Sequence, residues 1–185
     1  MRVFEKPGPS NTDETCRIAV ERAILLQAPI VTATTEGGAG VRLCEIAKEM
    51  GYKGDIIVVT HAYGSRKPGE NMLKEENREF MLNQGVRLVT AAHVLSGVER
   101  GLSSKFQGVY PGELMAHTLR MFSNGVKVTV EIGCMALDAG AIAYGSDIVC
   151  TAGTNKGLDT AVLMRPAHAN IILNTRIHEI LCMPY

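Results

Sequence analysis

Tryptophan is absent from this 185-residue sequence, and aromatic residues make up only 5% of it. A site that sandwiches a planar ligand between aromatic rings is therefore not evident. Charge of one sign is not in excess either, because 19 lysine and arginine residues balance 19 aspartate and glutamate residues. Nucleic acids and anionic membranes both require a basic surface, so neither is expected as the main partner.

Long apolar runs are also missing. No run reaches the ~20 residues that a membrane-spanning helix needs. The first residues, Met1–Pro7, lack the apolar core of a signal peptide. We therefore expect a cytoplasmic protein with no membrane partner.

Motifs typical of a zinc hydrolase, a redox dithiol or a serine nucleophile do not occur. The sequence has no His-Glu-x-x-His, Cys-x-x-Cys or Gly-x-Ser-x-Gly pattern. Its cysteines are odd in number, widely spaced and surrounded by apolar residues, so we interpret them as reduced packing residues and expect no metal site. They are Cys16, Cys44, Cys134, Cys150 and Cys182.

Hydrophobic residues make up 46% of the chain and charged residues 21%, which is sufficient for one domain over residues 1–185. Segments with helical spacing alternate with short apolar runs, which implies right-handed crossovers and a parallel sheet. We expect an α/β fold of three layers, α/β/α, with a mostly parallel sheet. Helices are expected around residues 12–26, 43–50, 71–83 and 111–124, and strands at 30–34, 55–60, 86–90, 147–151, 159–164 and 170–173.

Details at the ends of these elements add to the prediction. Asn11 followed by Glu14 predicts a capping box at the first helix, and Gly125 is expected to end the fourth. Residues 91–110 show little periodicity, and we interpret them as a loop with at most a short helix, of a length that is often functional. Residues 126–140 fit either a strand or a helix, and their length favours a helix.

Four of the expected strands end in a threonine, and these ends should meet at one edge of a parallel sheet, where α/β proteins bind ligands. The result would be a rim of hydroxyl groups with His61 and His93 beside it. The alternative is that threonine simply favours strands and helix caps. The four are Thr34, Thr60, Thr90 and Thr151.

The strongest local signal is the turn Thr34–Gly40, where a strand, a glycine-rich loop and a helix follow one another. Free amides and the helix dipole favour an anion at such a turn, and Arg42 could neutralise its charge. The alternative is an ordinary tight turn. The expected phosphate contacts come from Thr34, Thr35, Gly37, Gly38, Ala39 and Gly40.

This loop matches neither familiar nucleotide motif. A Walker loop ends in Gly-Lys-Ser/Thr, and a dinucleotide fingerprint requires a third glycine where Leu43 stands. Glu36 is unfavourable beside a polyphosphate, so a single phosphate suits the loop better.

Other candidates carry a weaker signal. The second glycine loop, which includes Gly153 and Thr154, could bind the other end of the ligand or form a hairpin. Glu131 and Asp138 would share a helix face, where a solvated or capping role is favoured over acid–base work.

Several segments together resemble the C-terminal domain of pyruvate kinase, in its stand-alone relatives, over nearly the whole chain. They are Phe4-Glu5-Lys6-Pro7-Gly8-Pro9, Thr34-Thr35-Glu36-Gly37, Gly108-Val109-Tyr110-Pro111, Asp138-Ala139-Gly140 and Val162-Leu163-Met164-Arg165-Pro166-Ala167-His168. The resemblance implies a domain with subunit contacts, hence a homo-oligomer, and without the catalytic residues of phosphoryl transfer. It also implies a phosphorylated ligand at the glycine-threonine loop, with flavin mononucleotide (FMN) as the ligand this group suggests.

We therefore expect the chain to bind a phosphorylated small molecule, with FMN as the leading candidate and no kinase activity. The expected contacts beyond the first loop are Thr60, His61, Thr90, His93, Gly153 and Thr154. One alternative is a flavin-dependent oxidoreductase in which His61 or His93 donates a proton. Another is an oligomeric scaffold or a metabolite sensor with a sugar-phosphate effector site.

Overall fold

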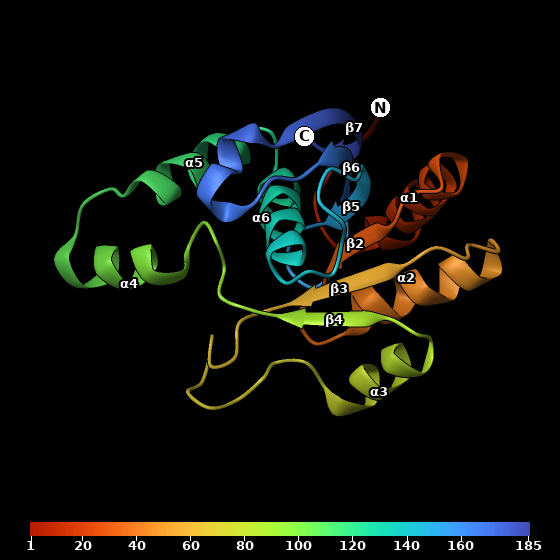
Figure 1. Cartoon of the computed structure of the whole chain (residues 1–185), viewed down its shortest axis with the longest axis horizontal. Helices are drawn as coiled ribbons and strands as arrows, with labels where there is room; N and C mark the ends of the chain where they lie inside the picture. Colours follow the sequence, from red (N-terminus) through yellow and green to blue (C-terminus); the bar gives the residue numbers. More distant parts are fainter.

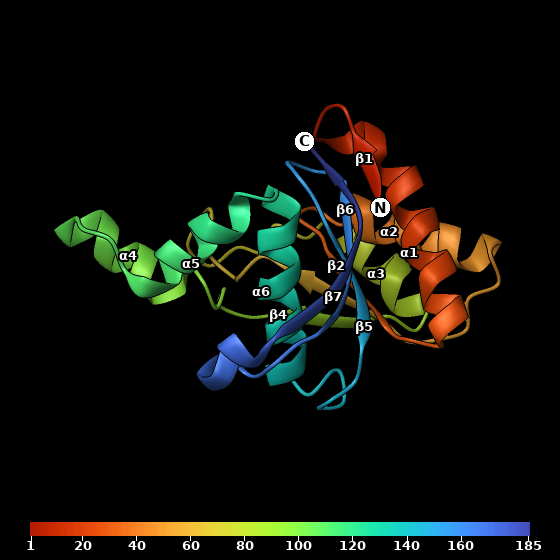
Figure 2. The same ribbon diagram turned by 90° about the horizontal axis from the view of Figure 1, so that it is seen from above.

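A computed structural model describes residues 1–185 and places seven strands in one sheet. The order of the strands across the sheet is β1-β7-β6-β5-β2-β3-β4. Figure 1 labels the strands from β7 to β4, and Figure 2 labels β1. The strands are β1 (Arg2–Phe4), β2 (Ile30–Ala33), β3 (Ile56–Thr60), β4 (Arg87–Thr90), β5 (Ile148–Ala152), β6 (Thr160–Arg165) and β7 (Arg176–Pro184). The α-helices are α1 (Thr12–Leu26), α2 (Gly38–Glu49), α3 (Glu75–Asn83), α4 (Gly97–Phe106), α5 (Pro111–Arg120) and α6 (Asn124–Asp138). Short 3₁₀ helices span Pro9–Asn11 and Ala169–Asn174.

Most of the sheet is parallel, as the alternation of elements predicts. Strand β2 pairs in parallel with both β3 and β5, β3 pairs with β4, and β1 pairs with β7. Only β6 runs against its neighbours, β5 and β7. No helix of the chain combines the length and the apolar character needed to cross a bilayer.

Helices cover the two faces of the sheet in separate layers. One face packs against α1 and α2 and the other against α6, so neighbouring residues of one strand enter different cores, as Ile30 and Val31 do. This two-sided burial explains why β2 and β3 are continuous apolar runs. Figure 2 shows α1, α2 and α3 on one side of the sheet and α6 on the other. The expected three-layer α/β/α fold is confirmed.

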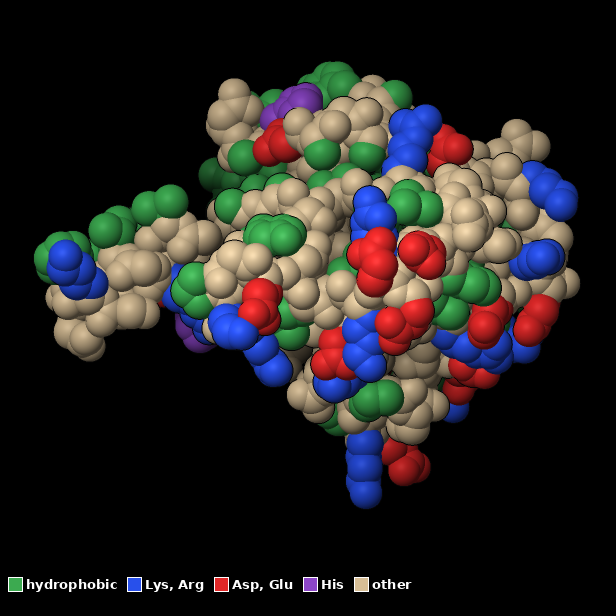
Figure 3. All heavy atoms as spheres, turned by 90° about the horizontal axis from the view of Figure 1, so that it is seen from below, with side chains coloured by type: hydrophobic (Ala, Val, Ile, Leu, Met, Phe, Trp, Pro, Cys, Tyr) green, Lys and Arg blue, Asp and Glu red, His purple; other side chains and the backbone are tan.

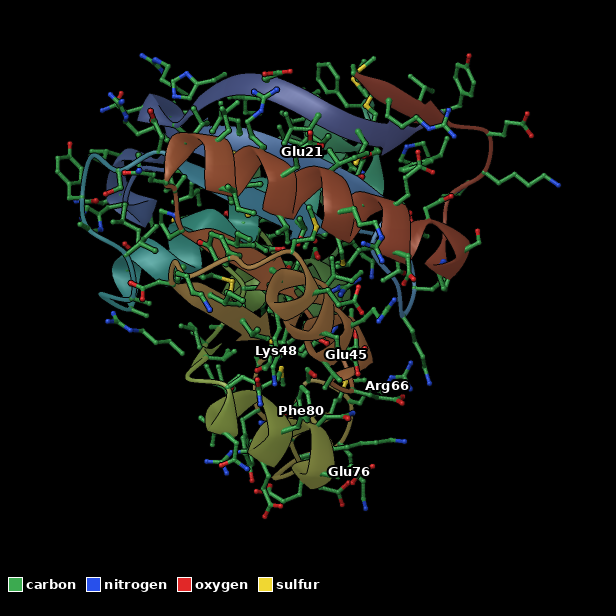
Figure 4. The ribbon with its side chains drawn as sticks, turned by 90° about the vertical axis from the view of Figure 1, so that its right-hand side faces the viewer. Glu21, Glu45, Lys48, Arg66, Glu76 and Phe80 are labelled. Carbon is green, nitrogen blue, oxygen red and sulfur yellow. The ribbon has the colours of Figure 1, made fainter.

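Figure 4 looks onto the outer side of the α1, α2 and α3 layer. Glu21, Glu45 and Lys48 are exposed on it, as expected for the polar face of an amphipathic helix. On α3, Met81 is fully buried, whereas Phe80 is 36% exposed. Helix α3 thus presents a narrower apolar stripe to the core than its sequence suggests.

Several expected elements differ in the structure. The helix expected from residue 71 begins at Glu75, because the Asn71 side chain accepts a bond from the Leu73 amide at 3.0 Å and stabilises a turn. Residues 170–173 form part of a 3₁₀ helix and not a strand. The last strand is β7, and neither it nor β1 was expected.

The expected capping box at α1 is wrong. Asn11 precedes the helix, but its Nδ2 donates to the Lys6 carbonyl at 2.8 Å and caps no helix amide. Glu14 pairs instead with Arg2 at 2.8 Å. Gly125 does not end a helix either, since it lies in the first turn of α6, whose cap is the Ser123 hydroxyl. The helical interpretation of residues 126–140 is correct.

Residues 91–110, expected to be mainly loop, contain the ten-residue helix α4. Together with α5 it projects from the body of the molecule (Figures 1 and 2). None of the α4 residues is buried, and apolar side chains are visible along the projection in Figure 3. The exposed apolar residues of this α4–α5 arm are Val98, Leu102, Phe106, Val109, Leu114, Met121 and Phe122.

Candidate functional site

The topology creates a crevice beside the carboxyl end of β2. The chain passes from β2 to β3 and β4 on one side and later returns through α6 to β5 on the other. A parallel sheet opens at such a switch point, and ligands bind there in α/β folds. The loop 34–37 leaves β2 at this point, and the loop 153–159 leaves β5. Both predicted glycine loops therefore lie at one edge of the sheet.

The first loop contains a run of unpaired amides. The backbone N–H groups of residues 35–39 donate to no other protein group. At the ends of this run, Thr34 N–H donates to the Val59 carbonyl at 3.0 Å, and Gly40 N–H reaches the Thr34 hydroxyl at 3.4 Å. The free amides lie at the start of α2, where the helix dipole adds partial positive charge. The amides on which the predicted anion site depends are therefore unpaired, except that of Gly40.

The three glycines of this loop differ in whether the structure could accept a side chain at their position. Gly37 adopts φ 107°, and a side chain on it would collide with Asn77 of α3. A Cβ on Gly40 would lie 2.6 Å from the sulfur of Met81. These two glycines are thus required by the packing of α3. Gly38 differs, because a Cβ there would meet nothing within 4 Å.

A cavity of about 580 Å³ lies at this edge of the sheet, a volume within the range of roughly 300–1,000 Å³ that is usual for small-molecule sites. Seven of the twelve residues predicted for the site line it, namely Thr34, Thr35, Ala39, Thr60, His61, His93 and Gly153. The other five do not line it: Gly37, Gly38, Gly40, Thr90 and Thr154.

Of the four threonines predicted to form a rim, Thr34, Thr60 and Thr90 are level with one another, and only Thr151 is out of register. Thr60 lies opposite Thr90, and their hydroxyls bond to each other at 2.6 Å, which satisfies Thr90 away from the cavity. Thr151 lies opposite Thr32 and donates to it at 2.8 Å, so it is level with the interior of β2 and not with Thr34. Only Thr34 and Thr60 of the four line the cavity.

The second glycine loop is held by Asp159, whose buried carboxylate accepts from the Thr154 amide at 3.1 Å and the Gly8 amide at 2.9 Å. The Thr154 amide is therefore occupied within the protein. Lys156 extends from the same loop and pairs with Glu36 of the first loop at 2.6 Å. This ion pair lowers the pKa of Glu36 and offsets the negative charge that the sequence places near the amides.

Positive charge predominates in the cavity wall. Arg100 and Arg120 line it from the α4–α5 arm, and neither forms an ion pair within the protein. Arg42, considered as a neutralising group, instead pairs with Asp13 at 2.7 Å and Glu45 at 2.8 Å. These partners and Glu49 hold Arg42 away from the loop, so the arm supplies the free cations.

A cluster of buried titratable side chains forms another part of the wall. Lys127 and Glu131, one turn apart on α6, form an ion pair in which the side chains are 5% and 1% exposed. His93 Nδ1 lies 3.5 Å from Glu131 Oε2, and the His93 ring stacks on His61 with 5.1 Å between centroids. All four residues line the cavity.

Burial and neighbouring charges shift the protonation of this cluster. Burial favours a higher pKa for Glu131, but contacts with His93 and Lys127 outweigh it and lower the pKa to about 2. Burial lowers the pKa of Lys127, against the attraction of Glu131. The pKa of His61 is also lowered, by burial first and then by His93. The carboxylate is thus an anion at neutral pH, and His61 is biased toward its uncharged form.

The expectation of a solvated or capping role is wrong for Glu131, and the two carboxylates of α6 do not act together. Asp138 lies seven residues further on, about 10 Å along the helix, where it pairs with His168 at 2.6 Å. Sequence reasoning also missed Lys127 as a site residue. Its position four residues before Glu131 in the stretch 126–132, where Lys127 and Glu131 are the only charged residues, was the signal that could have identified the pair.

The model of the family "Pyruvate kinase, alpha/beta domain" matches residues 13–164 of this chain. The chain belongs to this family. The matched range contains both glycine loops, the α4–α5 arm and the Lys127–Glu131 pair, so every part of the cavity wall described above lies within the pyruvate kinase alpha/beta domain.

A solved structure of pyruvate kinase from Cryptosporidium parvum is also similar, with 15% identity and a TM-score of 0.37. The alignment covers 94% of this chain but 23% of that one. The chain therefore spans about a quarter of the length of that enzyme.

The cysteines fit the interpretation as packing residues. All five are unpaired and buried. Burial raises the pKa of Cys16 to about 12 and that of Cys44 to about 11, so neither thiol is activated as a nucleophile.

Proposed function

We propose that this chain binds a phosphorylated small molecule, with its phosphate on the free amides of residues 35–39. The observation that carries the proposal is that this run of unpaired N–H groups adjoins a cavity with two unpaired arginines, Arg100 and Arg120. Amides at a helix start bind anions, and the arginines add charge-assisted donors. A single phosphate suits the site, since Glu36 lies in the same loop.

FMN is the specific ligand that we propose, and the residues of the cavity are compatible with it. The volume of about 580 Å³ accommodates more than a phosphate. The only aromatic side chains in the wall are histidines, and the stacked pair of His61 and His93 offers a flat imidazole surface for a ring. Residues 35–39 would hold the phosphate, and bound FMN would supply hydride or electron transfer. No kinase activity is expected.

Native mass spectrometry of the purified protein tests this proposal, because it reports the ligand mass and the number of subunits together. We expect a bound species with the mass of a phosphate ester, or binding of added FMN that is lost when the phosphate is removed from the ligand. A protein that carries no ligand, and whose melting temperature is unchanged by FMN and sugar phosphates, would refute it. Reduction of bound FMN by a nicotinamide cofactor with turnover would identify the alternative, a flavin-dependent oxidoreductase.

We also propose that the chain forms a homo-oligomer through the α4–α5 arm, which leaves the oligomeric scaffold as the remaining alternative. Val98, Leu102 and Phe106 lie four residues apart on one face of α4, and Val98 and Phe106 are 79% and 64% exposed. Because the net charge of the chain is zero, two copies do not repel each other electrostatically, which favours self-association. Light scattering should show an oligomer that Leu102→Glu dissociates. An unchanged mass in that variant, or a monomeric wild type, would contradict this.

A cytoplasmic setting is proposed as well, because reduced buried cysteines are typical of that compartment.

A further inference from the structure

The buried cluster beside the phosphate loop contains polar groups that a bound phosphate would not use. Lys127 and Glu131 are almost fully buried, yet both line the cavity. Removing an ion pair from water costs several kcal/mol, and an apolar pair of similar volume is often no less stable. The pair is therefore a poor candidate for a purely stabilising role. Perturbed charges in a cavity wall are typical of functional sites.

Glu131 has no capacity left for a ligand. Its Oε1 accepts from the Leu95 amide at 3.1 Å and from the Ser96 hydroxyl at 3.4 Å, and its Oε2 accepts from Lys127 with His93 beside it. The carboxylate thus fixes the position of the neighbouring groups. It connects the start of the α4–α5 arm to α6.

Lys127 and His93 do have capacity left. A lysine ammonium carries three N–H donors, and the only bond that the Lys127 side chain makes within the protein is to Glu131. His93 directs Nδ1 toward Glu131 Oε2 at 3.5 Å, and with the proton on Nδ1 the other ring nitrogen, Nε2, is an acceptor. This Nε2 is buried and has no partner. The cluster therefore presents unused donors and one unused acceptor.

Building on the phosphate site proposed above, we propose that Lys127 and His93 form a second subsite for the uncharged end of the same ligand, and that this end carries a hydrogen-bond acceptor next to a donor. The acceptor would receive a bond from Lys127, and the donor would bind His93 Nε2. A carbonyl beside an N–H group, or a hydroxyl group, has this chemistry. The ligand class is thus a phosphate monoester with a polar, uncharged head.

Charge balance disfavours a second phosphate at this position. Glu131 already neutralises Lys127, so an additional anion would lie near the buried carboxylate, and the free arginines of the same wall, Arg100 and Arg120, are assigned to the phosphate proposed above. A simple alkyl phosphate would leave His93 Nε2 unpaired, as it is in the free protein, and would gain no hydrogen bond there. His93 is 23% exposed at the cavity, and Nε2 is covered, so a side-chain rearrangement accompanies binding.

Calorimetric titration of the wild type with inorganic phosphate, butyl phosphate and FMN tests this subsite. His93→Phe keeps a ring of similar shape and leaves Glu131 with its other donors. We expect this variant to bind FMN roughly 5- to 150-fold more weakly, the equivalent of the lost bond, and to bind phosphate and butyl phosphate as the wild type does. His178→Phe is the control, because His178 is exposed and contacts Asp147, and it should bind all three probes normally.

The outcomes separate the two proposals. Equal affinity of His93→Phe and wild type for FMN, or wild-type affinity for FMN no greater than for butyl phosphate, would overturn the subsite and leave the phosphate site intact. Binding of none of the three probes would overturn both. If the variant does not fold, the ¹⁵N resonance of His93 Nε2 in the wild type provides the test. It should shift to a hydrogen-bonded position with FMN but not with butyl phosphate, and an unchanged resonance would refute the subsite.

Discussion

A carboxylate placed at Gly38 should separate phosphate binding from stability. Gly38 is the first residue of α2, and a Cβ there meets nothing within 4 Å, so Gly38→Asp introduces no clash. An acidic residue in the first helical turn stabilises a helix by about 0.3–1 kcal/mol, and replacing a helical glycine adds to this. We therefore expect the melting temperature of the variant to stay the same or to rise.

Ligand affinity should change in the opposite direction. A carboxylate on Gly38 would lie roughly 6 Å from a phosphate on the free amides, and at an effective dielectric constant of about 20–40 the repulsion is about 1.4–2.8 kcal/mol per phosphate charge. This corresponds to a roughly 10- to 100-fold weaker affinity.

Calorimetric titration with FMN measures the loss, and Gly38→Asn controls for the size of the side chain without its charge. If both variants bind alike, or if Gly38→Asp binds like the wild type, the phosphate does not lie at this helix start.

Three further predictions concern groups outside the loop. Glu131→Gln should lower the free energy of unfolding by roughly 3–5 kcal/mol, because it leaves Lys127 buried without a counter-charge; a loss below about 1 kcal/mol in urea denaturation would show that the pair is solvated. The depressed pKa of His61 means that the unfolded state binds more protons between the folded pKa and the ordinary value of about 6.5, so stability should fall as pH drops through that window. His61→Asn should remove that part of the pH dependence, and an identical pH profile in the variant would contradict the shift. The five buried thiols should not react with a thiol reagent in the native protein at pH 8 and should all react after denaturation; rapid native labelling would disprove their burial.

Much of the fold could be predicted because the local patterns agree with the packing. Strands β2, β3 and β5 are covered on both faces and therefore read as continuous apolar runs. The 3.6-residue spacing in α1 and α2 reflects faces that do contact the sheet. Strand β7 could not be predicted, because register shifts against β6 interrupt the alternation of buried and exposed residues along it. Strand β1 has only three residues, which is too short for a recognisable pattern.

Helix α4 was missed for a different reason. Its apolar positions, Val98, Leu102 and Phe106, have helical spacing, but glycines and serines lie between them and none of these side chains contacts the core. A helix without a buried face gives a weak sequence signal, since burial normally selects the pattern.

The site was predictable where it depends on the backbone and not where it depends on register or tertiary contacts. A strand, a glycine-rich turn and a helix are visible in the order of residues, so the loop 34–40 could be identified. The pairing of Thr151 with Thr32 depends on a register that no local pattern specifies. Arg42 could not be assigned either, because Asp13 comes from a different helix.

The most direct measurement of the central claim is a ¹H–¹⁵N NMR titration of the protein with inorganic phosphate. Amides of residues 35–39, which have no protein partner, should show the largest shifts, and the paired Thr34 amide should change little. Phosphate-induced shifts that avoid residues 35–39, or none at millimolar phosphate, would contradict an anion site at the start of α2.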